Sequence, residues 1–329
     1  MILAGDIGGT NTRLAVTERD SQGRIRIIRE QTVPSKQHAH LHAICREFLQ
    51  GESERPEAAC FGVAGPVHQN RCAATNLSWV VDGEHLIREL QIPCVTVIND
   101  LEANAYGIEC LERDDIDVIR AGEPEAVGHA VVISPGTGLG QAGMYWDGRR
   151  HIPVPTEGGH TDFGPQNALQ LALAQYLIDR HGRASWERVV SGPGLVNIYR
   201  FLRDTGRGDE PGWLKSIAEE ELAPKISQAA VEGRSPLCEM ALDLFLELLG
   251  AEAGNLALKY LALGGIWMGG GIVVKVRERL KGTPHFLRGL MNKGRMQDQI
   301  ARMPVRILVN DKTALLGAAN HGFQVRDSA

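Results

Sequence analysis

Short runs of hydrophobic residues, separated by polar turns, predict β-strands near the N-terminus. Apolar residues at 2–4 give way to the mostly polar stretch "GDIGGTNT", and a second apolar run follows at 13–17. Runs this short, bounded by glycine and threonine, are typical of strands. Further along, the pattern predicts strands at about 25–32, 58–64 and 94–98, and helices at about 39–50, 83–90 and from 101 onward. This alternation of strand and helix indicates an α/β protein.

The segment "AVVISPGTGLGQAGMYWDG" at 130–148 repeats the N-terminal arrangement. In each copy an apolar strand reaches a Gly/Thr turn and reverses into another strand. Such self-similarity predicts two related halves that face one cleft, while a chance likeness of two turns stays open as the alternative.

Two neighbouring segments of the second half differ in character. Residues 203–235 are rich in charge, glycine and proline, which predicts an exposed insertion with short helices rather than core. In 237–262 the near-helical spacing of apolar residues predicts a core helix, through Leu242, Phe245, Leu249 and Leu256. The acidic residues of this segment are expected on its other faces: Asp243, Glu247 and Glu252. A subunit contact is the alternative use of this helix.

Composition and charge narrow the classes of function. The chain has 329 residues, enough for two domains of about 150 residues each, and its net charge is −5. This charge argues against sequence-independent binding to nucleic acid or anionic lipid. No apolar run approaches the ~20 residues of a membrane helix, and no secretory leader precedes the first strand, so we expect a cytoplasmic protein. The six cysteines form no C-x-x-C pair, which predicts buried thiols rather than a zinc knuckle or disulfides.

Glycine clusters mark segments where the main chain is open to a ligand. The chain has 38 glycines, and the excess lies at 5–9, 136–143, 158–164 and 264–271. The first cluster is neither a P-loop, which ends in G-K-[ST], nor a Rossmann turn, which opens a helix, because "RLAV" continues as a strand. It predicts a β-hairpin whose N–H groups and hydroxyls hold an anion. Tight turns and close packing are the alternative use of these glycines.

Two such turns would grip the phosphates of one nucleotide. The residues that would line them are Gly8, Gly9, Thr10 and Asn11 in the first turn, and Gly136, Thr137 and Gly138 in the second. Asp6 would hold Mg²⁺ directly or through water, or else form an Asx-turn with its own hairpin. A third cluster, "MGGGIVV", predicts a strand followed by a helix, and Gly270 there would face a nucleoside or serve close packing.

Asn99 and Asp100 follow one predicted buried strand and precede a predicted helix. Catalytic groups of open α/β sheets favour this position, at the carboxyl end of a strand. Asn and Asp are also preferred helix N-caps, so a purely structural role is the alternative.

Three more polar residues lie in the second half. Glu157 and His160 are separated by two glycines, which disfavour a helix and predict a loop. One acid and one imidazole can accept from and donate to the hydroxyl groups of a polyol, whereas metal ligation lacks a second ligand pair at suitable spacing. The stretch "ASWERVV" predicts a helix that begins near Ser185 and has Glu187 in its first turn, either functional or simply solvated.

Taken together, these motifs resemble the bacterial ATP-dependent glucokinase family, within the hexokinase/actin-like ATPase superfamily. The segments that carry the resemblance cover almost the whole chain in the family's order: "DIGGTNTRLAV", "AGPV", "TNLSWV", "INDLEANAYG", "GTGLG", "EGGHTDF", "ERVVSGPGLVNIYR", "GGIWMGGGIV" and "LLGAA". The resemblance implies an α/β two-domain actin-like ATPase (ribonuclease H-like) fold with a cleft between the domains. A small domain is expected from 1–110 plus 301–322, a large one from 111–300, and a homodimer.

The resemblance also implies a role for each candidate residue. Asp100 would be the base that takes the proton of the 6-hydroxyl of D-glucose as that oxygen attacks the γ-phosphoryl group of ATP, with Mg²⁺ as cofactor. The other sugar hydroxyls would be bound by Asn99, Glu157, His160 and Glu187. The nucleotide phosphates would lie near Gly8, Thr10, Asn11, Thr137 and Gly138, with Gly270 nearer the nucleoside.

Two departures and two competing classes of protein bear on this interpretation. Pro135 stands where the family often has a small residue, which would stiffen the second turn. The C-x-C-G-x-x-G-C cluster of related zinc-bearing sugar kinases and repressors is missing from the sequence, so zinc is not expected. A sugar-responsive repressor would need a helix-turn-helix, for which the first strand leaves no room. An actin-like filament protein would not need the polar residues assigned to the sugar.

Overall fold

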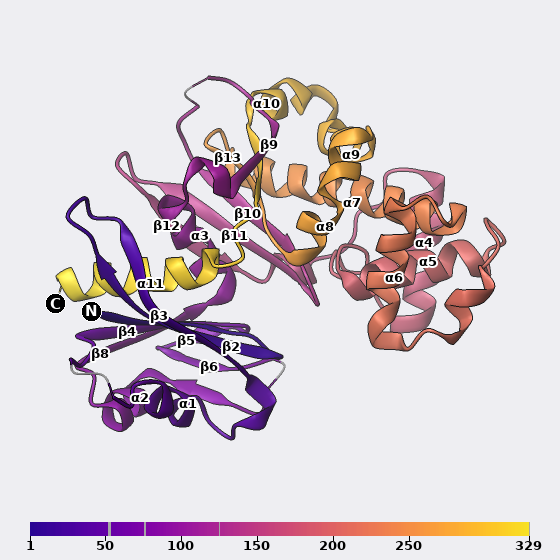
Figure 1. The fold of residues 1–329 in the computed structure, drawn as a ribbon. Helices are drawn as coiled ribbons and strands as arrows, with labels where there is room; N and C mark the ends of the chain where they lie inside the picture. The colour runs from indigo at the N-terminus through magenta and orange to yellow at the C-terminus, as the bar shows by residue number, and fades with distance from the viewer. Residues whose placement is uncertain (52–53, 76, 125, 329) are drawn as a thin grey trace. The chain divides into compact units, whose positions relative to one another are not determined.

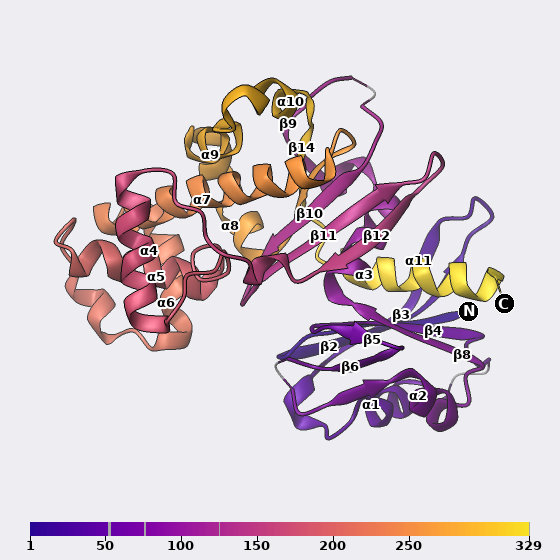
Figure 2. The same cartoon turned by 180° about the vertical axis from the view of Figure 1, so that it is seen from behind.

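A computed structural model describes residues 1–51, 54–75, 77–124 and 126–328 (Figures 1 and 2). The chain divides into two compact units. The first unit comprises Met1–Ile116, Arg150–Pro155 and Asn310–Ala329, and the second comprises Asp117–Arg149 and Thr156–Val309. Each unit has its own sheet and core, so each is described by itself.

The sheet of the first unit has the strand order β3-β2-β1-β4-β8. Its strands are β1 (Ile2–Ile7), β2 (Asn11–Arg19), β3 (Ile25–Pro34), β4 (Ala58–Val63) and β8 (Cys94–Asn99). Strand β1 pairs antiparallel with β2 and parallel with β4, and all six residues of β4 are buried. The predicted strands and the first hairpin are thus confirmed, because apolar runs covered on both faces form central strands.

The six-stranded sheet, built mainly from the second unit, has the order β12-β11-β10-β13-β14-β9. Its strands are β9 (Ile116–Arg120), β10 (Ala130–Pro135), β11 (Leu139–Trp146), β12 (His151–Thr156), β13 (Gly265–Met268) and β14 (Val305–Leu308). Strand β10 pairs antiparallel with β11 and parallel with β13. Strands β11, β10, β13 and β14 therefore repeat the order and directions of β2, β1, β4 and β8, with β12 at the edge position that β3 has in the first sheet. This repeat agrees with the expected likeness of the two halves. A small third sheet contains β5 (Val67–His68), β6 (Arg71–Ala73) and β7 (Val80–Asp82).

Helices connect and cover these strands. They are α1 (Leu41–Phe48), α2 (Gly83–Leu90), α3 (Asp100–Gly107), α4 (Ala168–His181), α5 (Gly192–Asp204), α6 (Glu219–Val231), α7 (Pro236–Tyr260), α8 (Gly271–Gly282), α9 (His285–Met291), α10 (Gln297–Arg302) and α11 (Thr313–Ser328). Among the described residues, none of the helices has a stretch long and apolar enough to cross a bilayer.

The predicted core helix is α7, and its apolar residues are buried as expected. Glu252, however, is fully buried, and its spacing from Phe245, Leu249 and Leu256 puts it on their face of the helix, so its expected place on another face was wrong. The prediction of an exposed insertion at 203–235 was wrong too, because α6 packs on α7 and buries Leu222 and Ile226. The charged residues of α6 lie on one face and made the segment look exposed in the sequence, but its other face is apolar and is buried, as in an amphipathic helix.

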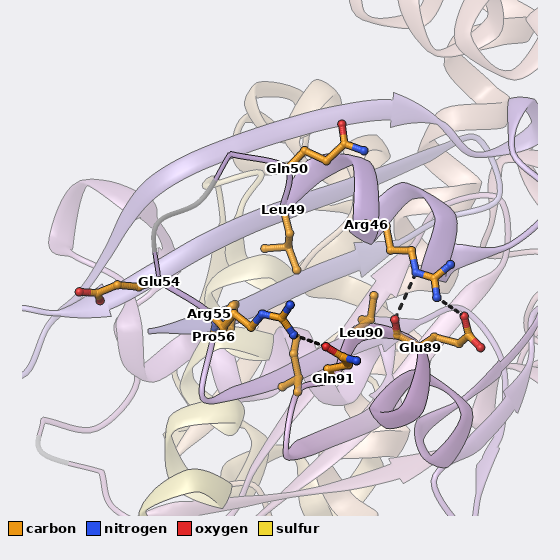
Figure 3. Close-up of a pocket in the computed structure, with 10 residues that line it drawn as sticks. Arg46, Leu49, Gln50, Glu54, Arg55, Pro56, Glu89, Leu90 and Gln91 are labelled. Atoms are coloured by element: carbon orange, nitrogen blue, oxygen red, sulfur yellow. Dashed lines mark hydrogen bonds and ion pairs between the residues drawn. The ribbon is translucent and has the colours of Figure 1, made fainter.

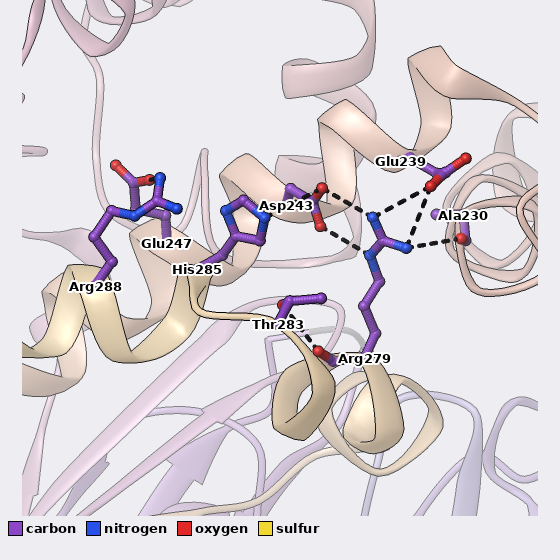
Figure 4. A network of polar contacts seen from close by, with 8 residues as sticks. All are labelled: Ala230, Glu239, Asp243, Glu247, Arg279, Thr283, His285 and Arg288. Atoms are coloured by element: carbon purple, nitrogen blue, oxygen red, sulfur yellow. Dashed lines mark hydrogen bonds and ion pairs between the residues drawn. The ribbon is translucent and has the colours of Figure 1, made fainter.

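A polar network joins α7 to α8 and α9 (Figure 4). The guanidinium of Arg279 donates from Nε and Nη2 to the two carboxylate oxygens of Asp243, each at 2.8 Å, and from Nη1 to the carbonyl oxygen of Ala230 at 3.3 Å. His285 Nε2 lies 3.4 Å from the same carboxylate. A two-pronged arginine–carboxylate contact fixes relative orientation, so the network anchors α8, the helix that follows the third glycine cluster.

Helices α3 and α11 cross at unusually close range in the first unit. A Cβ added to Gly317 would meet the carbonyl oxygen of Ala103, and one added to Gly107 would meet that of Thr313. The two helices approach this closely because glycine has no side chain to separate their backbones. Helix α3, which begins at Asp100, is therefore held against α11.

The six cysteines are free thiols, as predicted: four are buried and two, Cys94 and Cys110, are half-buried. Burial raises the pKa of the Cys110 thiol to about 12. A thiol that stays protonated at neutral pH is a poor nucleophile, so these cysteines serve packing.

The buried His321 of α11 is expected to make the stability of the fold depend on pH. Burial, with the charge of Arg150 adding to it, lowers the pKa of His321 to about 4. Its Nδ1 atom is buried without a hydrogen-bond partner among the described residues, and its ring lies 4.5 Å from that of Tyr106. Because the ordinary pKa is about 6.5, the unfolded chain binds a proton first as the pH falls, and stability present above pH ~6.5 is lost toward pH ~4.

Replacing His321 by Phe is expected to remove this loss while keeping the ring contact with Tyr106. Between pH 7 and pH 5 the free energy of unfolding of the wild type should fall by about 2 kcal/mol more than that of His321→Phe. Urea unfolding of both proteins at the two pH values measures the difference. Equal losses would show that His321 does not titrate on unfolding.

Candidate active site

The first turn joins β1 to β2, and hydrogen bonds from Ser35 fix its conformation. The Gly8 N–H donates to the Asn11 carbonyl at 3.0 Å. Ser35, which is fully buried, donates from its hydroxyl to the Gly8 carbonyl at 2.8 Å and from its N–H to the Thr10 carbonyl at 2.9 Å. Thr10 and Asn11 are exposed at the tip. Ser35 was missed by the sequence reasoning because nothing in its local pattern points 27 residues back along the chain.

Asp6 lies just before this turn, opposite Arg13 across the hairpin. Burial raises the pKa of the Asp6 carboxyl, the charge of Arg13 opposes that shift, and Asp311 adds to it. Arg13 in turn donates to the carboxylate of Asp311 at 3.1 Å. The sequence reasoning missed Arg13 and Asp311, whose distance along the chain hides their contact.

Asn99 ends β8 and caps α3, so the structural alternative for Asn99 is confirmed. Its side-chain oxygen accepts from the N–H groups of Leu101 at 2.9 Å and Glu102 at 3.4 Å, and Glu102 accepts from the Asn99 N–H in return. Its Nδ2 donates to the Gly65 carbonyl at 3.0 Å. An amide nitrogen has two hydrogens, so one remains for a ligand. Capping and ligand binding are therefore compatible.

Asp100, the first residue of α3, lies at the same sheet edge as the first turn. The parallel register pairs Ile7 with Val63 and Val63 with Asn99, so the ends of β1 and β8 are level. Two strand spacings separate them, about 10 Å. The structure thus brings the first turn, Asn99 and Asp100 together in one unit, with the half-buried Asp100 at the positive end of a helix dipole.

The second turn joins β10 to β11 and contacts the start of α5. The Gly136 N–H donates to the Gly138 carbonyl, and the Gly192 N–H donates to the Gly136 carbonyl, both at 2.8 Å. Thr137 is exposed at the tip. This hairpin turn was predicted, and its contact with a helix N-terminus adds an anion-favouring dipole beside it.

Glu187 lies outside any helix, so the helix predicted from Ser185 was wrong. Helix α5 begins only at Gly192, because Ser191 caps it through the Gly194 N–H at 2.9 Å and a proline follows in the first turn. Glu187 instead accepts from the Leu139 N–H at 3.1 Å, directly after the second turn. Its own N–H donates to the Gly159 carbonyl at 2.8 Å. Glu187 thus connects the second turn with the turn that carries His160.

His160 lies in a single 3₁₀ turn, Gly158–His160, where the sequence predicted a loop. His160 Nε2 and Glu157 Oε2 lie 3.9 Å apart, and both side chains are exposed. The turn lies flat on β11, since a Cβ on Gly159 would meet the carbonyl oxygen of Leu139. The structure therefore brings Glu157, His160 and Glu187 together beside the second turn.

Gly270 precedes α8 with φ of 89°, and a Cβ there would meet the carbonyl oxygen of Pro135. Close packing thus explains this glycine, and contact with a nucleoside stays a prediction. Strands β10 and β13 are parallel neighbours, so the glycines at 269–271 and the second turn lie at the same edge of the sheet. Among the described residues, no group of three or more His, Cys, Asp or Glu side chains could hold a metal ion.

The comparisons with known proteins decide the family. A family model described as Glucokinase matches residues 3–324. The chain belongs to the glucokinase family. It is 40% identical over 335 residues to the glucokinase of Nostoc sp. (strain PCC 7120 / SAG 25.82 / UTEX 2576), with 97% of this chain and 98% of that one covered.

Solved glucokinase structures agree with the fold. The glucokinase from an Antarctic psychrotroph has a TM-score of 0.85 at 31% identity and covers 98% of each chain. The ROK family glucokinase from Streptomyces griseus, in complex with glucose and AMPPNP, has a TM-score of 0.64 at 22% identity, over 98% of this chain and 99% of that one. Two mixed sheets with flanking helices are thus the architecture of actin-like sugar kinases, as the resemblance implied.

A pocket of about 420 Å³ lies elsewhere, where α1 and α2 end in the first unit (Figure 3). Arg46 and Arg55 line it, but each is engaged, Arg46 with Glu89 and Arg55 with Gln91 at 2.6 Å. It contains none of the residues that the glucokinase motifs single out. The pocket is therefore separate from the candidate active site.

Proposed function

We propose that this chain transfers the γ-phosphoryl group of ATP to the 6-hydroxyl of D-glucose, giving glucose 6-phosphate and ADP as the entry to glycolysis in the cytoplasm. The observation that carries the proposal is the shared sheet edge of the first turn and Asp100 in the first unit. Membership of the glucokinase family supports it, as do the glucose and AMPPNP bound to the Streptomyces griseus protein.

Asp100 acts as the general base in this proposal. Its carboxylate takes the proton of the 6-hydroxyl while that oxygen forms a bond to the γ-phosphorus, and the bond from phosphorus to the ADP oxygen breaks. Phosphoryl transfer asks the protein mainly for positioning and charge stabilisation. The cap holds Asp100 at a fixed helix start, and the free amide hydrogen of Asn99 donates to a sugar hydroxyl.

The remaining residues bind the two substrates. The main-chain N–H groups of the first and second turns contact the phosphates, and Gly270 lies nearer the nucleoside. Glu157, His160 and Glu187 bind the other sugar hydroxyls, with the 3.9 Å pair offering an acceptor and a donor side by side. Once a bound sugar excludes water from these groups, a sugar that lacks a hydroxyl would leave one of them unpaired and bind more weakly.

Asp6 would hold Mg²⁺, directly or through water. Magnesium commonly takes one or two protein carboxylates and fills its other positions with phosphate oxygens and water, so a single carboxylate fits. The pKa of Asp6 is raised because burial disfavours its charged carboxylate, and a bound cation would stabilise that charged form. When bound, the ion neutralises charge that develops on the phosphates.

A coupled assay of ADP release with a panel of sugars and donors tests the proposal. We expect glucose-dependent turnover with ATP, at a kcat within the usual range of about 1–100 s⁻¹ for kinases. We also expect loss of turnover when Mg²⁺ is chelated, and a homodimer by light scattering. ADP release that does not depend on any sugar would contradict the proposed function.

A further inference from the structure

A buried glutamine lies directly beneath the turn that carries Glu157 and His160. Gln141 of β11 is 1% exposed, and a Cβ on Gly158 would collide with its Oε1 atom. Its main-chain carbonyl accepts from the Thr156 hydroxyl at 3.0 Å, and that hydroxyl accepts from the Gly158 N–H at 3.2 Å. The side chain of Gln141 thus lies against the turn, and its main chain is linked to the turn through the Thr156 hydroxyl.

The amide of Gln141 has a fixed direction because of Glu252. Its Nε2 donates to Glu252 Oε1 at 2.8 Å, and Asn255 Nδ2 donates to the other carboxylate oxygen at 3.0 Å. A carboxylate only accepts hydrogen bonds. With its NH₂ group bonded to Glu252, Gln141 has its Oε1 atom on the side of Gly158.

That oxygen is buried and has no hydrogen-bond partner among the described residues. A buried acceptor without a partner is costly, and native structures contain few of them. The cost is tolerated here at the underside of a turn whose exposed side carries two proposed glucose ligands.

We propose that Gln141, oriented by Glu252, is a positioning residue for glucose. Its Oε1 accepts a hydrogen bond from the main-chain N–H of Gly158 or Gly159 when the Gly158–His160 turn closes on the sugar. Gln141 thereby sets the affinity for glucose without touching the sugar. The inference rests on the proposed function, because it needs glucose as a ligand of Glu157 and His160.

Kinetics of three variants test this role. Gln141→Leu removes the acceptor and should raise the KM for glucose about tenfold, with the KM for ATP and kcat within a factor of two or three. Glu252→Gln removes the constraint on the amide and should raise the KM for glucose as well. The exchange Gln141→Glu with Glu252→Gln restores the pair, since the new amide on α7 then donates to the new carboxylate on β11, whose second oxygen faces Gly158. This double variant should return the KM for glucose to within a factor of three of the wild type.

Gln170 of α4 provides a matched control, because it also donates to a carboxylate of α7. It is 3% exposed and donates from Nε2 to Glu247 Oε1 at 3.0 Å, but its own Oε1 already accepts from the Gln166 N–H at 2.8 Å. Gln170→Leu loses a similar bond to α7 that does not involve the Gly158–His160 turn, so the KM for glucose should not change. Glucose binding by calorimetry gives the same comparison without turnover.

The outcomes separate the inference from the proposed function. A wild type that neither binds nor phosphorylates glucose refutes the function. An active wild type whose KM for glucose is unchanged in Gln141→Leu refutes the positioning role alone. If Gln141→Leu does not fold, the exchange decides: a KM for glucose that the double variant does not restore from its value in Glu252→Gln shows that Gln141 serves only general stability. If Gln141→Leu folds, an equal rise of the KM for glucose in Gln170→Leu shows the same.

Discussion

Replacing Asp100 by Asn is expected to lower kcat by a factor of about 10²–10⁴ while glucose still binds. Loss of a general base typically costs this much, and an amide cannot take the proton of the 6-hydroxyl. The substitution keeps the size of the side chain at the first residue of α3 and leaves the neighbouring cap, Asn99, in place. Single-turnover measurements of glucose 6-phosphate formation, with glucose affinity from calorimetry, separate chemistry from binding.

Asp82 offers a matched control in the same unit. It caps α2 by accepting from the His85 N–H at 3.0 Å, so it too is an aspartate at a helix start. Asp82→Asn replaces one good cap by another and should leave kcat within a factor of two. An unchanged kcat in Asp100→Asn, or equal losses in both variants, would contradict the assignment of the base.

Much of the fold could be predicted because its signals are local. The apolar runs of β1 and β4 are covered on both faces, and continuous apolar runs carry that information directly. The two hairpin turns could be predicted from glycine and threonine between strands. The repeated motif predicted the likeness of the two halves but not the order of their strands.

Tertiary contacts explain two of the failures, at α6 and at Glu252. Charge along α6 hid an apolar face that becomes visible only where α6 packs on α7. The start of α5 was a local error, because Ser191 with the proline that follows it is the better helix start than Ser185. The burial of Glu252 was not predicted, and an isolated carboxylate is costly to bury. Two amide donors, Gln141 and Asn255, make its burial tolerable, and neither pairing can be read from spacing.

The candidate site shows the same division. Asn99 and Asp100 could be found because the end of a buried strand and the start of a helix are both visible in the sequence. The contact of Asn99 with the Gly65 carbonyl could not be found, since it depends on a residue 34 positions away along the chain. Ser35, Gln141 and Glu187 support the turns from distant segments, so only the folded chain identifies what they hold.

Replacing Gly159 by Ala is expected to lower kcat/KM for glucose about 100-fold. The new Cβ would collide with the Leu139 carbonyl oxygen, a main-chain atom that cannot move aside as a flexible side chain would. The turn would lift from β11, and the bond from the Glu187 N–H to the Gly159 carbonyl, now 2.8 Å, would lengthen. A displacement of about 1 Å at a positioned substrate group costs on the order of 10² in rate.

Gly164, five residues along the same segment, is the matched control for this substitution. A Cβ there would have only Gln166 Nε2 nearby, at 4.0 Å, so Gly164→Ala should leave kcat/KM within a factor of two. Both variants are compared at saturating ATP, with thermal unfolding to check that each is folded. Because Gly159 packs beneath His160 and bonds to Glu187, its substitution should also weaken discrimination against deoxy sugars. A folded Gly159→Ala protein with wild-type kcat/KM would mean that the turn does not position the sugar.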